Sequence, residues 1–191
     1  MSFSDGDFMK HLMVAALASA IAATPASAAL LLNLQQATPG AIALGSSTVF
    51  NLTIASDSGT TQVAGVSFTI TTGVDFSGIA TGGGQFSAGT NNLFGSNGGF
   101  VFPFPRSQQD FDANAVSSLA LGTTPVLLAT LTLDTAGATV GVHSMRLTNF
   151  GAVDDSYFPL AMSIITPGLD GTLRYEIVAA PVVSVPEPGS A

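Results

Sequence analysis

Few side chains in this sequence could carry out catalysis. His143 is the only histidine after residue 28, the chain has no cysteine, and no serine stands in a nucleophile-elbow motif. A catalytic triad or a zinc site needs several such groups together, and the sequence supplies no evident partners for His143. His143 shares the strand parity of Met145 and Leu147. We therefore expect a structural histidine that points inward or into a half-buried rim.

Carboxylates are the other groups that could bind a ligand or a metal. Asp110, Asp112 and Asn114 place oxygen atoms at alternate positions, as calcium loops do, and Asp154-Asp155 is a second acidic pair between strands. The first run lacks the glycine and the distal glutamate of an EF-hand loop. The preferred interpretation is two solvated acidic turns. The alternative is a weak structural Ca²⁺ site formed by Asp110, Asp112, Asp154 and Asp155, and no other cofactor is expected.

Acid–base hydrolysis needs two carboxylates in one cleft, one of them with a raised pKa. Most acidic residues after position 28 stand in expected turns, and glutamate occurs only at positions 176 and 187. The sequence offers no clear carboxylate pair. We predict that the protein is not an enzyme.

Aromatic residues supply a candidate ligand-contact surface. Phe100, Phe102 and Phe104 lie on one side of an extended segment whose two prolines restrict it to a sheet edge or a covering arm. We expect these rings to fill the core. The alternative is a sugar-stacking platform with Phe102 and Tyr157 as contacts. The absence of Trp weakens it, because sugar-binding faces use rings with a polar, water-tolerant edge.

Composition excludes some classes of partner. Charged residues make up 8% of the chain and the formal net charge is −8. Only three cationic side chains, Arg106, Arg146 and Arg174, follow residue 28. Binding to nucleic acid or anionic lipid needs clustered cations, so neither partner is expected.

The elements that must position these residues are predicted to be strands. Residues 126 to 150 form two alternating runs either side of a polar turn at 134–138. In the first run, Leu127, Ala129, Leu131 and Leu133 share one face and Leu128 lies on the other. A period of two is typical of half-buried strands. Further strands are expected at 30–36, 48–55, 63–72, 115–121, 158–165 and 172–179.

The segment from Gly78 to Gly99 is expected to be a long surface loop or a loosely ordered edge. It contains eight glycines, and ordering them costs much backbone entropy. No run has a helical period, so we predict an all-β fold of two stacked sheets.

The chain ends indicate export. Residues 1–28 are assigned to a signal peptide, which is expected to be helical, because an apolar run leads to small residues at Ala26 and Ala28. Its true start is expected at Met9. Cleavage is expected after Ala28. A β-sandwich domain at 29–180 and a linker at 181–191 complete the predicted organisation.

The linker carries the motif Val185-Pro186-Glu187-Pro188. It resembles the opening of a PEP-CTERM sorting segment. The resemblance implies an apolar membrane span, an arginine cluster and processing by an exosortase in Gram-negative bacteria that make extracellular polysaccharide. Three residues follow Pro188, so this chain encodes no span there. Either the sorting segment continues past residue 191 or this copy is released.

Three runs, at 65–70, 127–133 and 141–149, resemble successive strands of the cohesin family. That family is a nine-stranded jelly-roll sandwich related to some carbohydrate-binding modules. Thr72-Gly73 stands where many cohesins have a Tyr-Asp pair. The resemblance therefore implies the fold and not recognition of dockerin.

Together these observations predict a secreted or cell-surface, non-enzymatic β-sandwich protein with a matrix or adhesion role. Its expected partners are extracellular polysaccharide or surface proteins, together with an exosortase if the full sorting signal exists. The alternative function is that of a carbohydrate-binding module.

Overall fold

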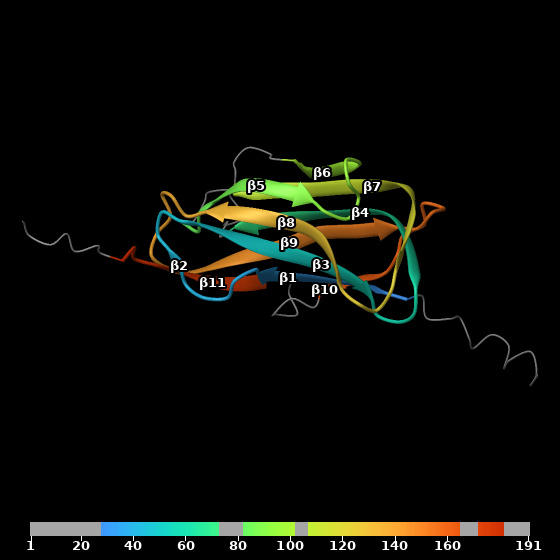
Figure 1. Ribbon diagram of the computed structural model, residues 1–191, viewed down its shortest axis with the longest axis horizontal. Coiled ribbons are helices and arrows are strands. Elements are labelled where there is room, and N and C mark those ends of the chain that lie inside the picture. The colour runs from blue at the N-terminus through green and yellow to red at the C-terminus, as the bar shows by residue number, and fades with distance from the viewer. Residues whose placement is uncertain (1–27, 73–81, 102–106, 165–171, 182–191) are drawn as a thin grey trace, which may run out of the picture.

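The computed structural model describes residues 28–72, 82–101, 107–164 and 172–181, and these residues form a two-sheet β-sandwich (Figure 1). No helix occurs among them, as the period-of-two patterns predict. Within these ranges no helix has the length and hydropathy that a bilayer-spanning segment needs. The predicted signal-peptide helix lies outside the described residues.

Eleven strands occur among the described residues, two more than the predicted nine, because β2 and β5 were not predicted as strands. They are β1 (Leu30–Gln36), β2 (Ile42–Ala43), β3 (Ser47–Ser56), β4 (Thr61–Thr72), β5 (Gln85–Asn91), β6 (Gly98–Val101), β7 (Gln108–Leu121), β8 (Val126–Asp134), β9 (Gly141–Val153), β10 (Met162–Ile164) and β11 (Thr172–Val178). The five-stranded sheet has the order β10-β1-β3-β8-β5 and the six-stranded sheet the order β2-β11-β9-β4-β7-β6.

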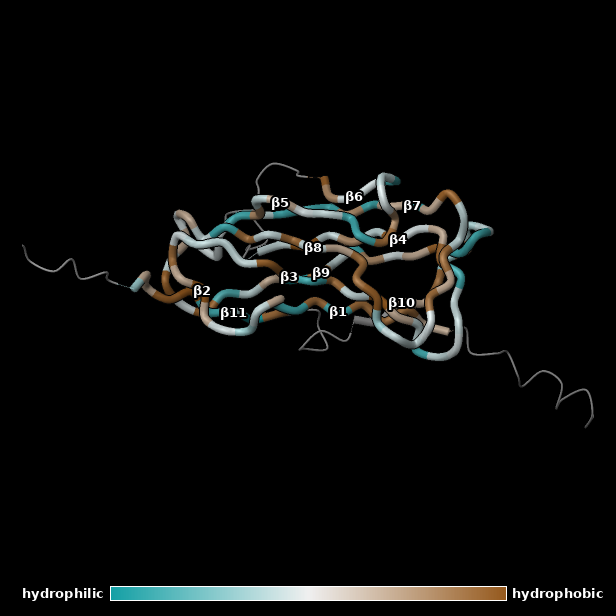
Figure 2. Tube along the Cα trace, viewed as in Figure 1, coloured by the Kyte–Doolittle hydropathy of each residue, from teal (hydrophilic) through white to brown (hydrophobic). Residues whose placement is uncertain are grey.

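The core lies between the sheets and is made of the inward-facing residues of both. On β3, which corresponds to the strand predicted at 48–55, the alternate residues Phe50, Leu52 and Ile54 are fully buried. On β4, Phe68 stacks on Phe111 of β7 with ring centroids 4.7 Å apart. Figure 2 shows hydrophobic and hydrophilic positions alternating along the strands. Without cysteine, this packing has to hold the sandwich together.

The predicted inward and outward faces of β8 are wrong for two adjacent leucines. Leu128 is fully buried, whereas Leu127 is 40% exposed. The pairing of β8 with β3 shifts between Leu52 and Thr53, where Leu128 is the unpaired extra residue. A bulge of this kind reverses the faces of the residues beyond it, so Leu128 replaces Leu127 in the core.

The glycine-rich segment is only partly the loop that was expected. It contains β5, an edge strand of the five-stranded sheet, and the first residues of β6, the corresponding edge of the other sheet. A Cβ atom on Gly89 would lie 2.3 Å from Cδ2 of Phe100. Glycine at this position therefore makes room for an aromatic ring of the core.

Phe100 confirms the core interpretation of the first aromatic position. Its ring makes edge contacts with Phe68 and Phe111, at centroid distances of 6.1 and 5.1 Å. The predicted edge strand corresponds to β6, and Phe102 lies outside the described residues.

Two other strand predictions change in extent. The strand predicted at 115–121 is the second half of the 14-residue β7, which begins at Gln108. The strand predicted at 158–165 is reduced to β10 and one isolated bridge between Val153 and Pro159.

Candidate functional site

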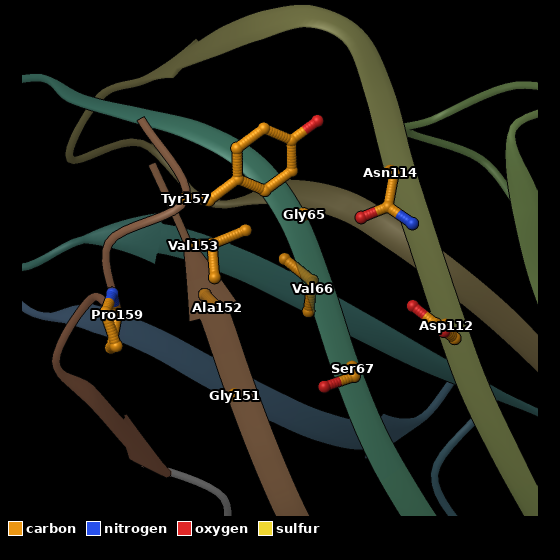
Figure 3. Close-up of a pocket in the computed structure, with 10 residues that line it drawn as sticks. All are labelled: Gly65, Val66, Ser67, Asp112, Asn114, Gly151, Ala152, Val153, Tyr157 and Pro159. Carbon is orange, nitrogen blue, oxygen red and sulfur yellow. The ribbon is translucent and has the colours of Figure 1, made fainter. Parts of the chain in front are cut away.

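A groove of about 450 Å³ lies on the outer face of the six-stranded sheet, across β9, β4 and β7 (Figure 3). The turn that follows β9 borders it on one side. Its lining residues are Gly65, Val66, Ser67, Asp112, Asn114, Gly151, Ala152, Val153, Tyr157 and Pro159.

Glycine at position 65 allows the side chains of the groove to approach the central strand. A Cβ atom on Gly65 would lie 2.5 Å from Oδ1 of Asn114 and 3.2 Å from Cγ2 of Val153. Gly151 on the neighbouring strand β9 also lacks a side chain, and Ser67 lies close to it. The bottom of the groove is consequently formed in part by glycines, which have no side chain to fill it. Side chains from three strands and a turn surround it.

Tyr157 is a strongly exposed member of the site. Its side chain is 78% exposed and its φ angle is 62°, in the left-handed region that non-glycine residues seldom occupy. Figure 3 shows the ring extending over the end of the groove near Gly65 and Val153. A strained backbone at an exposed aromatic residue is a feature that clusters at functional sites.

The turn from Asp154 to Phe158 holds Tyr157 in this conformation. The Asp154 carboxylate accepts hydrogen bonds from the backbone N–H groups of Ser156, at 2.8 Å, and Phe158, at 2.9 Å. The N–H of Asp154 donates to the carbonyl of Phe158, and that of Tyr157 donates to the carbonyl of Asp154. Asp154 is therefore committed to the turn, and the sequence-based expectation of an acidic turn is correct here.

Asp110 and Asp112 lie on β7 and not in a turn, contrary to the preferred interpretation. The Asp110 carboxylate accepts a hydrogen bond from the hydroxyl of Thr69 at 2.8 Å. Asp112 is exposed and borders the groove. No group of three or more His, Cys, Asp or Glu side chains that could hold a metal ion occurs among the residues that the structure describes. Calcium binding stays a prediction.

Asp112 also borders a second hollow of about 630 Å³, at the side of the sandwich. Residues of β5 and β6 line it, among them Phe100 and several glycines. Asp112 thus stands between two depressions of one surface. Sequence reasoning named Asn114 only with the acidic run and missed Ser67 as a member of the site, because only the pairing of β4 with β7 brings the two strands together.

His143 has a structural environment, in line with the expectation. Its Nε2 atom lies 2.8 Å from the carbonyl oxygen of Thr139, and its ring centroid lies 5.9 Å from that of Tyr175. The buried Tyr175 hydroxyl donates to the carbonyl of Gly83, and burial raises the pKa of this phenol above its usual value. These contacts connect the end of β9 and β11 to the segment before β5.

The remaining predicted sites are not described by the structure. Phe102, Ala26 and the motif Val185–Pro188 lie outside the described residues, and Ala28 precedes β1.

Structural comparison finds cohesin modules similar to this chain. The non-cellulosomal cohesin of the archaeon Archaeoglobus fulgidus aligns with a TM-score of 0.53 and 10% identity, over 80% of this chain and 92% of that chain. The seventh ScaB type I cohesin of Pseudobacteroides cellulosolvens aligns with a TM-score of 0.55 and 10% identity, over 82% and 97%. The sixth cohesin of Acetivibrio cellulolyticus scaffoldin B, solved in complex with a mutant Cel5 dockerin, aligns with a TM-score of 0.50 and 13% identity, over 79% and 97%.

At these identities the likeness is one of fold. It confirms the predicted cohesin-like jelly-roll sandwich. No protein-family model matches the sequence. A search of curated proteins finds no match either.

Proposed function

We propose that this chain is a non-enzymatic binding module of the bacterial cell surface or extracellular matrix, and that it holds a partner protein on the outer face of its six-stranded sheet. The observation that carries the proposal is Tyr157, an exposed ring kept in a strained conformation over a glycine-floored groove. Tyrosine is among the residues that most often dominate the free energy of protein–protein binding.

The comparisons support a protein partner without identifying it. The similar cohesin of Acetivibrio cellulolyticus was solved with a dockerin, so a sandwich of this fold can hold a protein. Thr72-Gly73 differs from the Tyr-Asp pair of many cohesins. The partner we propose is therefore a surface protein other than a dockerin.

A carbohydrate ligand in the same groove is the second candidate. The Tyr157 ring has the polar edge that sugar-stacking residues need, and Asp112, Asn114 and Ser67 lie around the groove with hydrogen-bonding groups. In this alternative the chain is a carbohydrate-binding module.

Site-specific photo-crosslinking separates the two candidates. A benzophenone amino acid replaces Tyr157 in the full chain, produced in its own bacterium, and the matched control carries it at Val140, which is 57% exposed and does not line the groove. The proposal predicts a discrete protein adduct at position 157 and none at position 140. An adduct that contains only glycan supports the second candidate, and the lack of any adduct at position 157 contradicts both.

Export and sorting are proposed on the chain ends alone. The signal peptide at 1–28 and the motif Val185–Pro188 support secretion and processing by an exosortase. The genomic codons after Ala191 test the sorting step. An apolar span followed by arginines is expected, and a stop codon directly after Ala191 contradicts anchoring.

A further inference from the structure

The outer face of the five-stranded sheet presents amides and hydroxyls in register. Gln35 of β1 pairs with Asn51 of β3, and Asn51 pairs with Thr130 of β8. Thr130 in turn pairs with Thr90 of β5. With strands about 4.8 Å apart, this row crosses roughly 14 Å of the sheet. We call the row and its outward-facing neighbours Leu31, Val49 and Leu127 the neutral face.

The polar groups of the row have hydrogen-bonding capacity to spare. Thr130 accepts one long hydrogen bond, at 3.5 Å, from the amide of Asn92. The side-chain amides of Gln35 and Asn51 make no hydrogen bond to another described residue. Amides and hydroxyls both donate and accept, as the hydroxyl groups of sugars do.

Apolar side chains flank the row. Val49 is 39% exposed and Leu127 is 40% exposed, the latter because the bulge in β8 turns it outward. A surface that mixes neutral hydrogen-bonding groups with aliphatic groups suits a ligand that is amphipathic in the same way. The rings of a polysaccharide have this character, with hydroxyls at their edges and C–H groups on their faces.

Formal charge is almost absent from this face. The four strands β1, β3, β8 and β5 contain a single charged residue, Asp134, which is the last residue of β8 and accepts a hydrogen bond from the N–H of Ala136. The strands of the six-stranded sheet carry Asp110, Asp112, Arg146, Arg174 and Glu176. The charges of the described strands are thus gathered on the opposite sheet.

This distribution identifies the class of ligand. Nucleic acid and anionic lipid need cations, and the neutral face has none. The face also lacks the Trp, Tyr and Arg side chains that anchor most protein interfaces. We propose that the neutral face binds an uncharged polysaccharide, which lies across the strands without any need to desolvate a charge.

The proposal is independent of the protein partner on the other sheet, because the two surfaces lie on opposite sides of the sandwich (Figure 1). If both bind, the module connects a surface protein to the polysaccharide matrix. Without ring stacking each contact is weak, so binding depends on the many repeats of a polymer.

Native affinity electrophoresis of the full chain tests the proposal, with hydroxyethyl cellulose as the neutral polymer and alginate as the acidic one. The test variant is Asn51→Lys combined with Thr130→Lys, and a second, uncharged variant is Asn51→Leu combined with Thr130→Val. The matched control on the other sheet is Val142→Lys, at a residue that is 68% exposed and does not line the groove. A separate variant, Tyr157→Ala, tests whether the sugar occupies the groove instead. Each migration is compared with the same variant in a gel without polymer, and melting temperatures verify the fold.

We expect hydroxyethyl cellulose, and not alginate, to retard the wild type, Val142→Lys and Tyr157→Ala. The two neutral-face variants should need at least about fivefold more polymer for the same retardation, which corresponds to about 1 kcal/mol. Equal retardation of the wild type and the folded neutral-face variants overturns the proposal, as does the absence of any retardation of the wild type. Loss of retardation in Tyr157→Ala alone also overturns it and places the sugar in the groove.

Discussion

At the scale of single residues, the candidate site depends on side chains held in unfavourable or crowded positions. Tyr157 occupies a left-handed conformation, and Gly65 leaves the space that Asn114 and Val153 use. Neither arrangement improves the core, since both lie on the outer face of a sheet. Both arrangements cost stability, and a role in binding explains them more readily than a role in folding.

Replacing Tyr157 by Gly should stabilise the fold and remove binding. Relief of the left-handed strain outweighs the extra entropy of the unfolded glycine, so we expect the free energy of unfolding to rise by about 1 kcal/mol. Urea unfolding measures this change, and the crosslinking partner, once identified, reports binding.

Tyr157→Asn is the control, because asparagine tolerates the same φ angle without a gain in backbone entropy. A loss of stability in both variants would contradict the idea that position 157 is strained in favour of function.

At the scale of elements, bulges decide which residues enter the core and which lie on the outer face of the sheet. The bulge in β8 directs Leu128 inward and Leu127 outward. A second irregularity, in the pairing of β4 with β9, includes Asn149 at a φ angle of 51°. It lies next to Gly151 and precedes the turn that carries Tyr157.

The β8 bulge predicts unequal effects for two adjacent leucines. Leu128→Ala removes a fully buried side chain and should lower the free energy of unfolding by about 2–5 kcal/mol. Leu127→Ala should lower it by less than about 1 kcal/mol, because that side chain is 40% exposed. Chemical denaturation of both variants checks the difference, and similar losses would show that the bulge is wrongly placed.

Tyr175 connects β11 of one sheet to the segment before β5 of the other. Its buried phenol should make the free energy of unfolding fall at alkaline pH. Because burial raises the pKa of its phenol in the folded state, the stabilisation is complete below the usual tyrosine pKa of about 10. It is lost as the pH rises further, by up to about 1.4 kcal/mol per pH unit.

Tyr175→Phe should cost about 1 kcal/mol at pH 7, from the hydrogen bond lost to the Gly83 carbonyl. It should also flatten the fall above pH 10. Urea unfolding at pH 7, 9, 10 and 11 measures both effects. Parallel curves for the wild type and the variant would argue against a buried phenol.

At the scale of the whole molecule, the sandwich separates two kinds of surface. The six-stranded sheet carries the strand charges and the groove, and the five-stranded sheet carries a neutral, regular face. If both proposals hold, the separation lets one module meet two chemically different partners.

Hydrogen bonds also hold Ala29, the residue at which the mature chain is predicted to begin. The N–H of Ala29 donates to the Asp57 carboxylate at 2.9 Å, and the N–H of Asp57 donates to the carbonyl of Ala29. If the chain is processed after Ala28, the new α-ammonium group lies beside this carboxylate. The signal-peptide cleavage would then create an exposed ion pair that fastens β1.

Asp57→Asn should therefore lower the free energy of unfolding of the chain that begins at Ala29 by about 0.5 kcal/mol at low salt. The effect should largely disappear in 1 M salt, because screening weakens exposed ion pairs. Thermal unfolding at the two salt concentrations checks this. An equal effect at both would contradict the ion pair.

The sequence by itself determined the fold class and most of the strands. The first strand was predicted with the bounds that β1 has, and the strand predicted at 48–55 lies within β3. These predictions succeed because alternation is a local property, since successive side chains of a strand point to opposite faces. The same locality explains why the acidic turn at Asp154-Asp155 could be predicted.

Only the tertiary structure decided which strands become neighbours and where the pairing slips. Leu128 replaced Leu127 in the core because a bulge depends on the partner strand, which local alternation does not record. The glycine-rich segment became β5 because the Phe100 ring fills the space that Gly89 leaves. The groove joins residues far apart in sequence, such as Ser67, Asp112 and Tyr157, so its existence follows from strand order and register and not from any motif.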